Sequence, residues 1–313
     1  MRFRNHCRLK YALICCPHFQ FRQWQRAIAK KGACDEDACL GRALRDAKTG
    51  CWFPGPGDPW RQPIRGFQSE ESRAGQIIAY TEKICDVLSR CNKIVVVGCG
   101  PKANGVVDLI RMGYEVTGVE PIQEYVTLAG QRAGDPRRAV LGSAESLPFP
   151  SQSQAVVIME HVFERVDSPR QSLAEIYRVL IPGGVAYIAT SNRYHFSPIG
   201  YNGEFNVPFY NWFPDALKEA FVHHLQFKPS LANYTPRPAV HWFCYSDLCR
   251  VGRDAGFCWF YSRIDCLLPT DGSIEKSLVR RLALRLVQRN PWLRSMALLQ
   301  FGNAAFMMKR SEP

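Results

Sequence analysis

The chain has 313 residues, of which 46% are hydrophobic and 22% charged, so it can bury a substantial core and is not a disordered protein. Its formal net charge of +12 raises the question of a nucleic-acid partner. The central residues 93–195 nevertheless carry 10 basic and 10 acidic side chains, and the sequence has no nucleic-acid recognition motif. We therefore expect no nucleic-acid partner.

Cysteine usage and hydropathy indicate the compartment. The 13 cysteines are odd in number and irregularly spaced, and no apolar signal-peptide core precedes a cleavage site, which predicts reduced thiols in a cytoplasmic chain. Cys34 and Cys39, or Cys7 with Cys15 and Cys16, lack the second spaced pair typical of zinc sites, so no metal is expected. No apolar stretch approaches the roughly 20 residues of a membrane-spanning helix.

The N-terminal part of the chain has little pattern. Residues 1–70 show no sustained helix or strand period, and residues 51–66 contain four prolines and three glycines, so we predict a weakly structured arm and linker. Residues 71–313 would form the folded domain. Within it, residues 71–90 predict an amphipathic helix whose apolar face holds Ile77, Ile78, Thr81, Ile84, Cys85 and Leu88.

Strand and helix patterns then alternate between residues 93 and 192. Strands are expected at 93–100, 114–121, 155–160 and 185–192. Helices are expected at 104–113, 122–134 and 168–184, the last closed by Pro182, Gly183 and Gly184. Single helices between strands imply parallel crossovers, so the predicted fold is α/β with a doubly wound, Rossmann-like sheet. Ligands of such sheets bind beyond the carboxyl ends of the strands.

The C-terminal third continues this pattern and adds a basic segment. Residues 245–265 predict a helix ended by Gly256 and then a strand, and residues 301–310 predict a final strand. Residues 275–296 predict a basic helix with leucines along one side and no acidic residue after Glu275. The leucines are expected to face the core, with the arginines solvated. The alternative is peripheral contact of this helix with an anionic membrane surface.

A glycine turn follows the first buried strand. Gly98 and Gly100 allow a tight turn and a close approach of the backbone to a ligand at the N-terminus of the next helix. Residues 98–103 fit the dinucleotide pattern G-x-G-x-x-G/A, and Glu120 lies 22 residues beyond the first glycine, where an acid would bind ribose hydroxyls. S-adenosylmethionine, whose ribose also needs such an acid, is the second candidate ligand.

Five segments decide between these ligands, namely 95–100 (VVVGCG), 116–121 (VTGVEP), 142–150 (GSAESLPFP), 160–166 (EHVFERV) and 177–192 (YRVLIPGGVAYIATSN). In this order they resemble the class I S-adenosylmethionine-dependent methyltransferases, in particular the small-molecule group that includes the ubiquinone-pathway enzymes. The resemblance implies S-adenosylmethionine as cofactor and an antiparallel pair of strands at one edge of a mostly parallel sheet.

The resemblance also assigns roles to residues. Gly98, Cys99 and Gly100 would pass under the methionine part of the cofactor, and Glu120 would bind its ribose. Pro121 and Ile122 would flank the adenine, whose edge would meet Ser143, Ala144 and Glu145. Met159, Glu160 and His161 would border the sulfonium end, with Glu160 orienting the cofactor's amino group. The chain departs from the family pattern at Val96, Ser143, Gln154 and Arg165.

These assignments predict the reaction. We expect methyl transfer to a small-molecule acceptor at an oxygen atom, in a lipid-linked or sugar precursor, with His161 as general base and His195 and His241 as rival bases. Residues 194–213 hold eight aromatic residues and begin an insertion at about 194–243, which is expected to cap the sheet, to line the acceptor pocket, or both. The alternative function is a catalytically silent, methyltransferase-like binding protein at a membrane surface.

Overall fold

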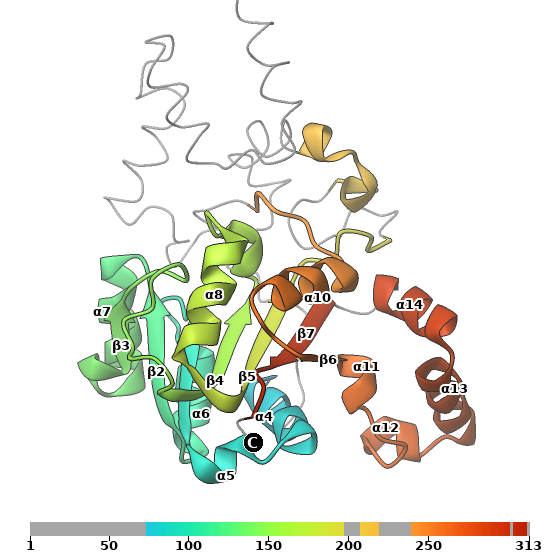
Figure 1. The fold of residues 1–313 in the computed structure, drawn as a ribbon, viewed down its shortest axis with the longest axis horizontal. Helices are drawn as coiled ribbons and strands as arrows, with labels where there is room; N and C mark the ends of the chain where they lie inside the picture. The colour runs from blue at the N-terminus through green and yellow to red at the C-terminus, as the bar shows by residue number, and fades with distance from the viewer. Residues whose placement is uncertain (1–72, 197–206, 219–238, 301–302, 312–313) are drawn as a thin grey trace, which may run out of the picture. The chain divides into compact units, whose positions relative to one another are not determined.

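The computed structural model describes residues 73–196, 207–218, 239–300 and 303–311 (Figure 1). The predicted arm at 1–70 lies outside the described residues, and so do Cys7, Cys15, Cys16, Cys34 and Cys39. The chain divides into two compact units, of which one holds residues 66–195 and 243–313 and the other residues 1–65 and 196–242. The first unit contains the sheet.

A seven-stranded sheet is the framework of this unit, with the strand order β3-β2-β1-β4-β5-β7-β6. Its strands are β1 Lys93–Val97, β2 Glu115–Glu120, β3 Ala139–Leu141, β4 Gln154–Glu160, β5 Leu180–Thr190, β6 Trp259–Ser262 and β7 Asn303–Met308. Strands β1 to β5 pair in parallel, whereas β7 pairs antiparallel with both β5 and β6. The predicted fold class and the antiparallel edge are therefore confirmed.

Helices cover both faces of the sheet (Figure 1). Helices α4 Arg73–Ile84, α5 Val87–Arg90, α6 Asn104–Arg111 and α7 Gln123–Ala133 contribute buried residues to one core, and α8 Pro169–Val179 and α10 Tyr245–Asp254 to the other. The C-terminal part adds α11 Arg263–Cys266, α12 Gly272–Glu275, α13 Leu278–Arg289 and α14 Pro291–Gln300. Such crossover helices on both faces define a doubly wound sheet.

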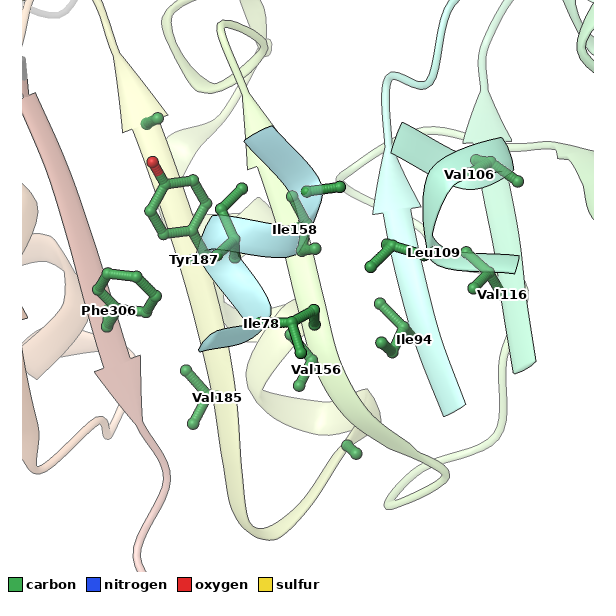
Figure 2. Packing of buried hydrophobic residues seen from close by; sticks show 14 of the residues in the cluster. Ile78, Ile94, Val106, Leu109, Val116, Val156, Ile158, Val185, Tyr187 and Phe306 are labelled. Carbon is green, nitrogen blue, oxygen red and sulfur yellow. The ribbon is translucent and has the colours of Figure 1, made fainter. Parts of the chain in front are cut away.

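The two cores follow from the alternation of side chains along each strand. In β4, Val156 and Ile158 belong to one core, and Val157 and Met159 to the other. Figure 2 shows the first core, where Ile78 of α4 lies against the strands beside Ile158 and Val156. Because central strands are buried on both faces, they appear in the sequence as continuous apolar runs.

Several boundaries differ from the prediction. The expected helix 71–90 is interrupted at Cys85–Asp86 between α4 and α5. Helix α8 ends at Val179, and Pro182, Gly183 and Gly184 lie in β5, because Leu180 is already extended at φ −69° and ψ 135°. Pro182 also disfavours the helical conformation for Ile181, the residue before it, so the helix does not continue through Ile181. Strand β3, only three residues long, was not predicted because it is too short to show a period.

The predicted basic helix 275–296 is also divided. It comprises the end of α12, the whole of α13 and part of α14. Asn290, which precedes Pro291, is extended at φ −107° and ψ 110° and separates α13 from α14. The expectation that its leucines face the core is wrong, since Leu278, Leu282 and Leu286 are exposed.

Candidate active site

The glycine turn joins β1 to α6 at the carboxyl edge of the sheet. Gly98 and Gly100 have φ of +68° and +63°, in the left-handed region that favours glycine. A Cβ on Gly98 would lie 2.3 Å from Val162 Cγ2, so a side chain is excluded there. A Cβ on Gly100 would have no heavy atom within 4 Å, so this part of the turn faces open space. Cys99 lies between them, half-buried, and burial raises the pKa of its thiol to about 12.

Glu120 stands beside this turn, at the end of β2. The backbone N–H of Gly100 donates a hydrogen bond of 3.0 Å to Glu120 Oε2. The carboxylate is buried, and burial raises its pKa to about 7, an effect that hydrogen bonds from the Gly100 and Ile122 backbones partly offset. Ile122 is half-buried and occupies the N-cap position before α7, whereas Pro121 is exposed. The structure therefore brings together the glycine turn and the acid that the sequence analysis paired with it.

The loop after β3 holds the three residues assigned to the adenine edge. Ser143 and Ser146 form an isolated β-bridge, and Ala144 is buried in the second core. Glu145 Oε1 accepts hydrogen bonds from the backbone N–H groups of Asp167 at 2.7 Å and Ser168 at 3.3 Å. The Glu145 side chain thus holds the segment that precedes α8. Contact of this loop with adenine stays a prediction.

At the end of β4, Met159 is buried in the second core and Glu160 forms an ion pair. The partner is the Arg73 guanidinium at the start of α4, which donates through Nε to Glu160 Oε1. Burial opposes the charge on Arg73, but Glu160 and Tyr187 raise the pKa of the guanidinium above its usual value. The assigned role of Glu160 toward the cofactor's amino group stays a prediction, and Arg73 competes for the same carboxylate.

His161 follows Glu160 in a left-handed conformation at φ +54°. Its backbone N–H donates to Ala189 O at 2.8 Å, which fixes it between the ends of β4 and β5. Its Nδ1 lies 3.4 Å from Glu164 Oε1, and the ring is half-exposed while Glu164 is buried. A neutral imidazole held through Nδ1 presents Nε2 as a proton acceptor.

Glu164 lies at the centre of a small polar cluster. Its Oε1 also accepts hydrogen bonds from the N–H and Oγ of Ser191, each at 3.4 Å, and within the described structure its Oε2 has no hydrogen-bond partner. Burial alone would raise the pKa of Glu164, but the hydrogen bond from His161 and the charge of Arg165 hold it below its usual value. The carboxylate is therefore ionised at neutral pH.

Sequence analysis missed Arg73, Glu164 and Ser191. Arg73 lies in α4, and nothing in its spacing relates it to Glu160, 87 positions away. Glu164 carried a detectable signal, because an acid three residues after a histidine lies on the same side of a helical turn. The short 3₁₀ helix Phe163–Arg165 supplies that turn.

The other rival histidines are placed differently. His195 follows β5, and its backbone N–H donates to Asn192 O at 3.1 Å. His241 lies in the second compact unit with most of the predicted insertion. In that unit, the ring of Phe196 lies 5.8 Å from that of Phe209 and 6.2 Å from that of Trp212. Of the remaining predicted aromatic segment, residues 197–206 lie outside the described residues.

Of the four departures from the family pattern, Ser143 lies in the loop after β3 and the other three lie in β4, the turn after it, and β1. Gln154 is buried at the start of β4, where its Nε2 donates to Ser153 Oγ at 3.0 Å. Arg165 is buried, and its Nε donates to His161 O at 2.9 Å. Val96 lies in β1, with its side chain partly buried against the first core. The side chains of Gln154 and Arg165 thus form hydrogen bonds at the start of β4 and in the turn after it.

Comparison with known proteins identifies the domain. A family model described as a methyltransferase domain matches residues 95–188, from β1 through the glycine turn, Glu120 and His161 into β5. Residues 95–188 therefore match a methyltransferase domain, and this part of the chain is similar to the class I S-adenosylmethionine-dependent methyltransferases. The cofactor of this family is S-adenosylmethionine. Membership of the ubiquinone-pathway subgroup stays a prediction.

The relatives of the methyltransferase domain are distant. A protein from Mycolicibacterium smegmatis, described as a probable S-adenosylmethionine-dependent methyltransferase, is 36% identical over 104 residues, which are 32% of this chain and 38% of that protein. Among solved structures, a possible histamine N-methyltransferase from Thermotoga maritima is 16% identical with a TM-score of 0.41, over 74% of this chain and 89% of that chain. A methyltransferase from Mesorhizobium loti is 14% identical with a TM-score of 0.43, over 73% and 94%.

The residues of the methyltransferase domain fit the cofactor. The turn at Gly100 faces open space at the N-terminus of α6, where backbone can approach a ligand closely. The Glu120 carboxylate beside it is an acceptor for hydroxyl donors. Among the described residues, no group of three His, Cys, Asp or Glu side chains could hold a metal ion.

Proposed function

We propose that this protein transfers a methyl group from S-adenosylmethionine to an oxygen atom of a small-molecule acceptor. The observation that carries the proposal is the pair formed by His161 and the buried Glu164, 3.4 Å apart, at the end of β4. This strand pairs in parallel with β1, whose end carries the glycine turn. A base and a cofactor turn on neighbouring strand ends are what acceptor activation requires.

The cofactor, when bound, supplies an electrophilic methyl group on a sulfonium sulfur, so the protein mainly has to position the acceptor. Gly98, Cys99 and Gly100 would hold the methionine part, and Glu120 the ribose hydroxyls. Pro121, Ile122 and the loop Ser143–Glu145 would enclose the adenine. Met159 and Glu160 would border the methionine end, where Glu160 is shared with Arg73.

His161 would remove the proton of the acceptor hydroxyl. His161 Nδ1 donates a hydrogen bond to Glu164. This selects the tautomer in which His161 Nε2 is unprotonated and can take the proton of the hydroxyl that is to be methylated. The same carboxylate would stabilise the imidazolium that forms, because it is ionised and buried. Glu164 is thus a positioning residue, and His161 is the proposed catalytic residue.

For the acceptor class we propose a hydroxyl of a lipid-linked or sugar precursor. The support is the aromatic segment that follows β5 in the chain, where Phe196, Phe209 and Trp212 have exposed rings close to one another. Aromatic rings bind both apolar chains and the flat faces of sugars. The acceptor experiment therefore includes both kinds of compound.

A second candidate is a catalytically silent, methyltransferase-like binding protein. The observation in its favour is that two carboxylates assigned to the cofactor already have protein partners, Glu160 with Arg73 and Glu145 with the segment before α8. In that case the chain would keep the fold without using the cofactor.

Calorimetric titration with S-adenosylmethionine and S-adenosylhomocysteine separates the two candidates. The enzyme is expected to bind both saturably, and the silent protein neither. Transfer of labelled methyl to hydroxyl-bearing lipids and sugars then tests the reaction. In that assay His161→Gln should lower kcat by about 100-fold or more. Glu164→Gln should lower kcat in the same way, and neither change should abolish cofactor binding. The double variant should be no slower than His161→Gln, because the two residues act as one unit. Additive losses would contradict the pair.

A further inference from the structure

Helix α13 presents its apolar side outward. Leu278, Val279, Leu282 and Leu286 have exposed fractions between 49% and 75%. At 3.6 residues per turn, Leu278, Leu282 and Leu286 form one stripe, with Val279 beside it. Leu284, on the opposite side, is buried. Within the described structure, α13 packs against the protein through the side that holds Leu284. The leucine stripe on the opposite side is left exposed.

Hydrogen bonds fix the rotation of α13 about its axis. Gln288 Nε2 donates to Ile264 O and Leu267 O, each at 2.9 Å, from the same side of α13 as Leu284. Ser277 caps the first turn by accepting from the Arg280 backbone N–H at 3.4 Å. Rotating the helix to bury the leucines would break the Gln288 bonds and expose Leu284. The outward direction of the stripe is thus built into the fold.

Helix α14, which packs beside α13, carries two further exposed apolar side chains. Trp292 and Met296 are four residues apart, so they lie on one side of α14, and both are exposed. Figure 1 shows α13 and α14 side by side at the end of the unit beyond β6, away from β1 to β3. The active-site residues at the ends of β1, β2 and β4 are on other elements. This surface is therefore distinct from the proposed active site.

Arginines border the stripe. Arg281, Arg285 and Arg289 follow one another at intervals of four residues along one side of it, and Arg285 and Arg289 are exposed. No acidic residue occurs in the sequence between Glu275 and Glu312. Arg294 is different, since it pairs with Asp265 at 2.5 Å and anchors α14 to α11. The exposed arginines therefore give the apolar stripe a positive border without acidic neutralisation along these helices.

We propose that this face of α13 and α14 binds the surface of an anionic phospholipid bilayer. Its members are Leu278, Val279, Leu282, Leu286, Trp292 and Met296, with Arg285 and Arg289. Leucines entering the acyl boundary, arginines meeting lipid phosphates and a tryptophan at the interface match the chemistry of such a surface. Nucleic acid would satisfy the arginines but leave the leucines in water. None of the helices in the described part of the chain is long and apolar enough to cross a membrane.

Co-sedimentation of the full chain with vesicles tests this proposal. Vesicles of phosphatidylcholine with phosphatidylserine should bind the protein, vesicles of phosphatidylcholine alone should bind it weakly, and binding should decrease between about 0.05 M and 0.5 M salt. Changing Arg285 and Arg289 together to Gln should weaken binding by about 25-fold, at roughly fivefold per arginine. Changing Leu282 and Leu286 together to Ser should remove binding at high salt.

Matched controls come from the opposite end of the unit. Arg111 and Arg132 are exposed on α6 and α7. Changing both to Gln lowers the net charge by the same amount as changing Arg285 and Arg289. Leu128→Ser replaces an exposed leucine of α7. These variants should bind vesicles like the parent, and circular dichroism should show all variants folded. Equal binding to both vesicle types, or no binding, would overturn the proposal. So would sedimentation of the parent as a dimer that Leu282→Ser with Leu286→Ser makes monomeric, because a second copy would then cover the stripe.

This inference does not depend on the reaction. The vesicle assay contains no cofactor, so a silent protein would still bind and an active enzyme could fail to bind. If both proposals hold, a lipid-linked acceptor becomes the first class to assay.

Discussion

The backbone N–H of Gly100 donates a 3.0 Å hydrogen bond to Glu120 Oε2, which joins the turn after β1 to the end of β2. The Glu120 carboxylate is buried, and burial raises its pKa to about 7. A ligand that offers hydroxyl donors would compensate this buried charge. The charge state of Glu120 should therefore depend on whether the cofactor is bound beside Gly100.

Replacement of Glu120 should weaken cofactor binding. Glu120→Ala is expected to reduce the affinity for S-adenosylhomocysteine by about 1.5–3 kcal/mol, because hydrogen bonds to a charged group are lost. Titration calorimetry measures the change. Glu124→Ala, an exposed acid in the first turn of α7, is the control and should bind like the parent. Equal affinity of the Glu120 variant and the parent would show that the ribose binds elsewhere.

The same residue should make stability depend on pH. Its folded pKa of about 7 lies above the ordinary 4.5, so the folded state holds this proton more tightly than the unfolded state. The resulting stabilisation is complete below about pH 4.5 and is lost as the pH rises through about 7. Glu120→Gln cannot ionise, so its stability relative to the parent should increase by up to about 3 kcal/mol between those pH values. Urea unfolding at about pH 5 and pH 8 tests this, and a constant difference would contradict it.

Gly98 and Gly100 should respond differently to alanine. Both substitutions place a Cβ at positive φ, which costs roughly 1–2 kcal/mol. Only Gly98→Ala also brings a Cβ to 2.3 Å from Val162 Cγ2, so it should lower the free energy of unfolding more. In a Val162→Ala background most of the excess should disappear, since only Val162 Cβ, at 3.3 Å, would remain close. Chemical denaturation of Gly98→Ala and Gly100→Ala, each with Val162 and with Val162→Ala, gives the comparison. An unchanged excess would show that the contact with Val162 does not cause the larger loss of stability in Gly98→Ala.

Lys309 should stabilise the antiparallel edge of the sheet. Its buried Nζ donates to Tyr177 O at 3.0 Å and Leu180 O at 2.8 Å and lies 4.5 Å from the centre of the Tyr177 ring. Lys309→Met leaves those carbonyls without this donor and should cost about 2 kcal/mol of stability. Arg310→Met, at the exposed neighbouring position, should cost little. Similar thermal unfolding of the two variants would argue against a role for the buried amine.

Ser143 tests the proposed adenine position. An aspartate there is common in the resembled family, and its carboxylate would accept from the adenine amino group more strongly than a hydroxyl. Ser143→Asp should therefore tighten binding of S-adenosylmethionine severalfold, whereas Ser146→Asp, on the exposed residue of the same β-bridge, should not. Weaker or unchanged binding by Ser143→Asp would place adenine away from this loop.

The local pattern was sufficient for the central strands and the glycine turn. The run 94–97 is apolar because β1 is buried on both faces, and Gly98 and Gly100 mark its end because only glycine adopts their φ values easily. Glu120 could be paired with that turn because parallel neighbouring strands end at the same edge. These features depend on residues close in the chain or on a crossover rule, so the sequence expresses them directly.

Other features depend on contacts between distant segments. The ion pair of Arg73 with Glu160 and the cluster of Glu164 with His161 and Ser191 form where α4, β4 and β5 meet, which no spacing reveals. The α13 leucines gave an amphipathic pattern, but the pattern is the same whether the apolar side faces a core or solvent. Packing of Leu284 and the hydrogen bonds of Gln288 decided the direction, because they determine how the helix is rotated against α11 and the residues that follow it.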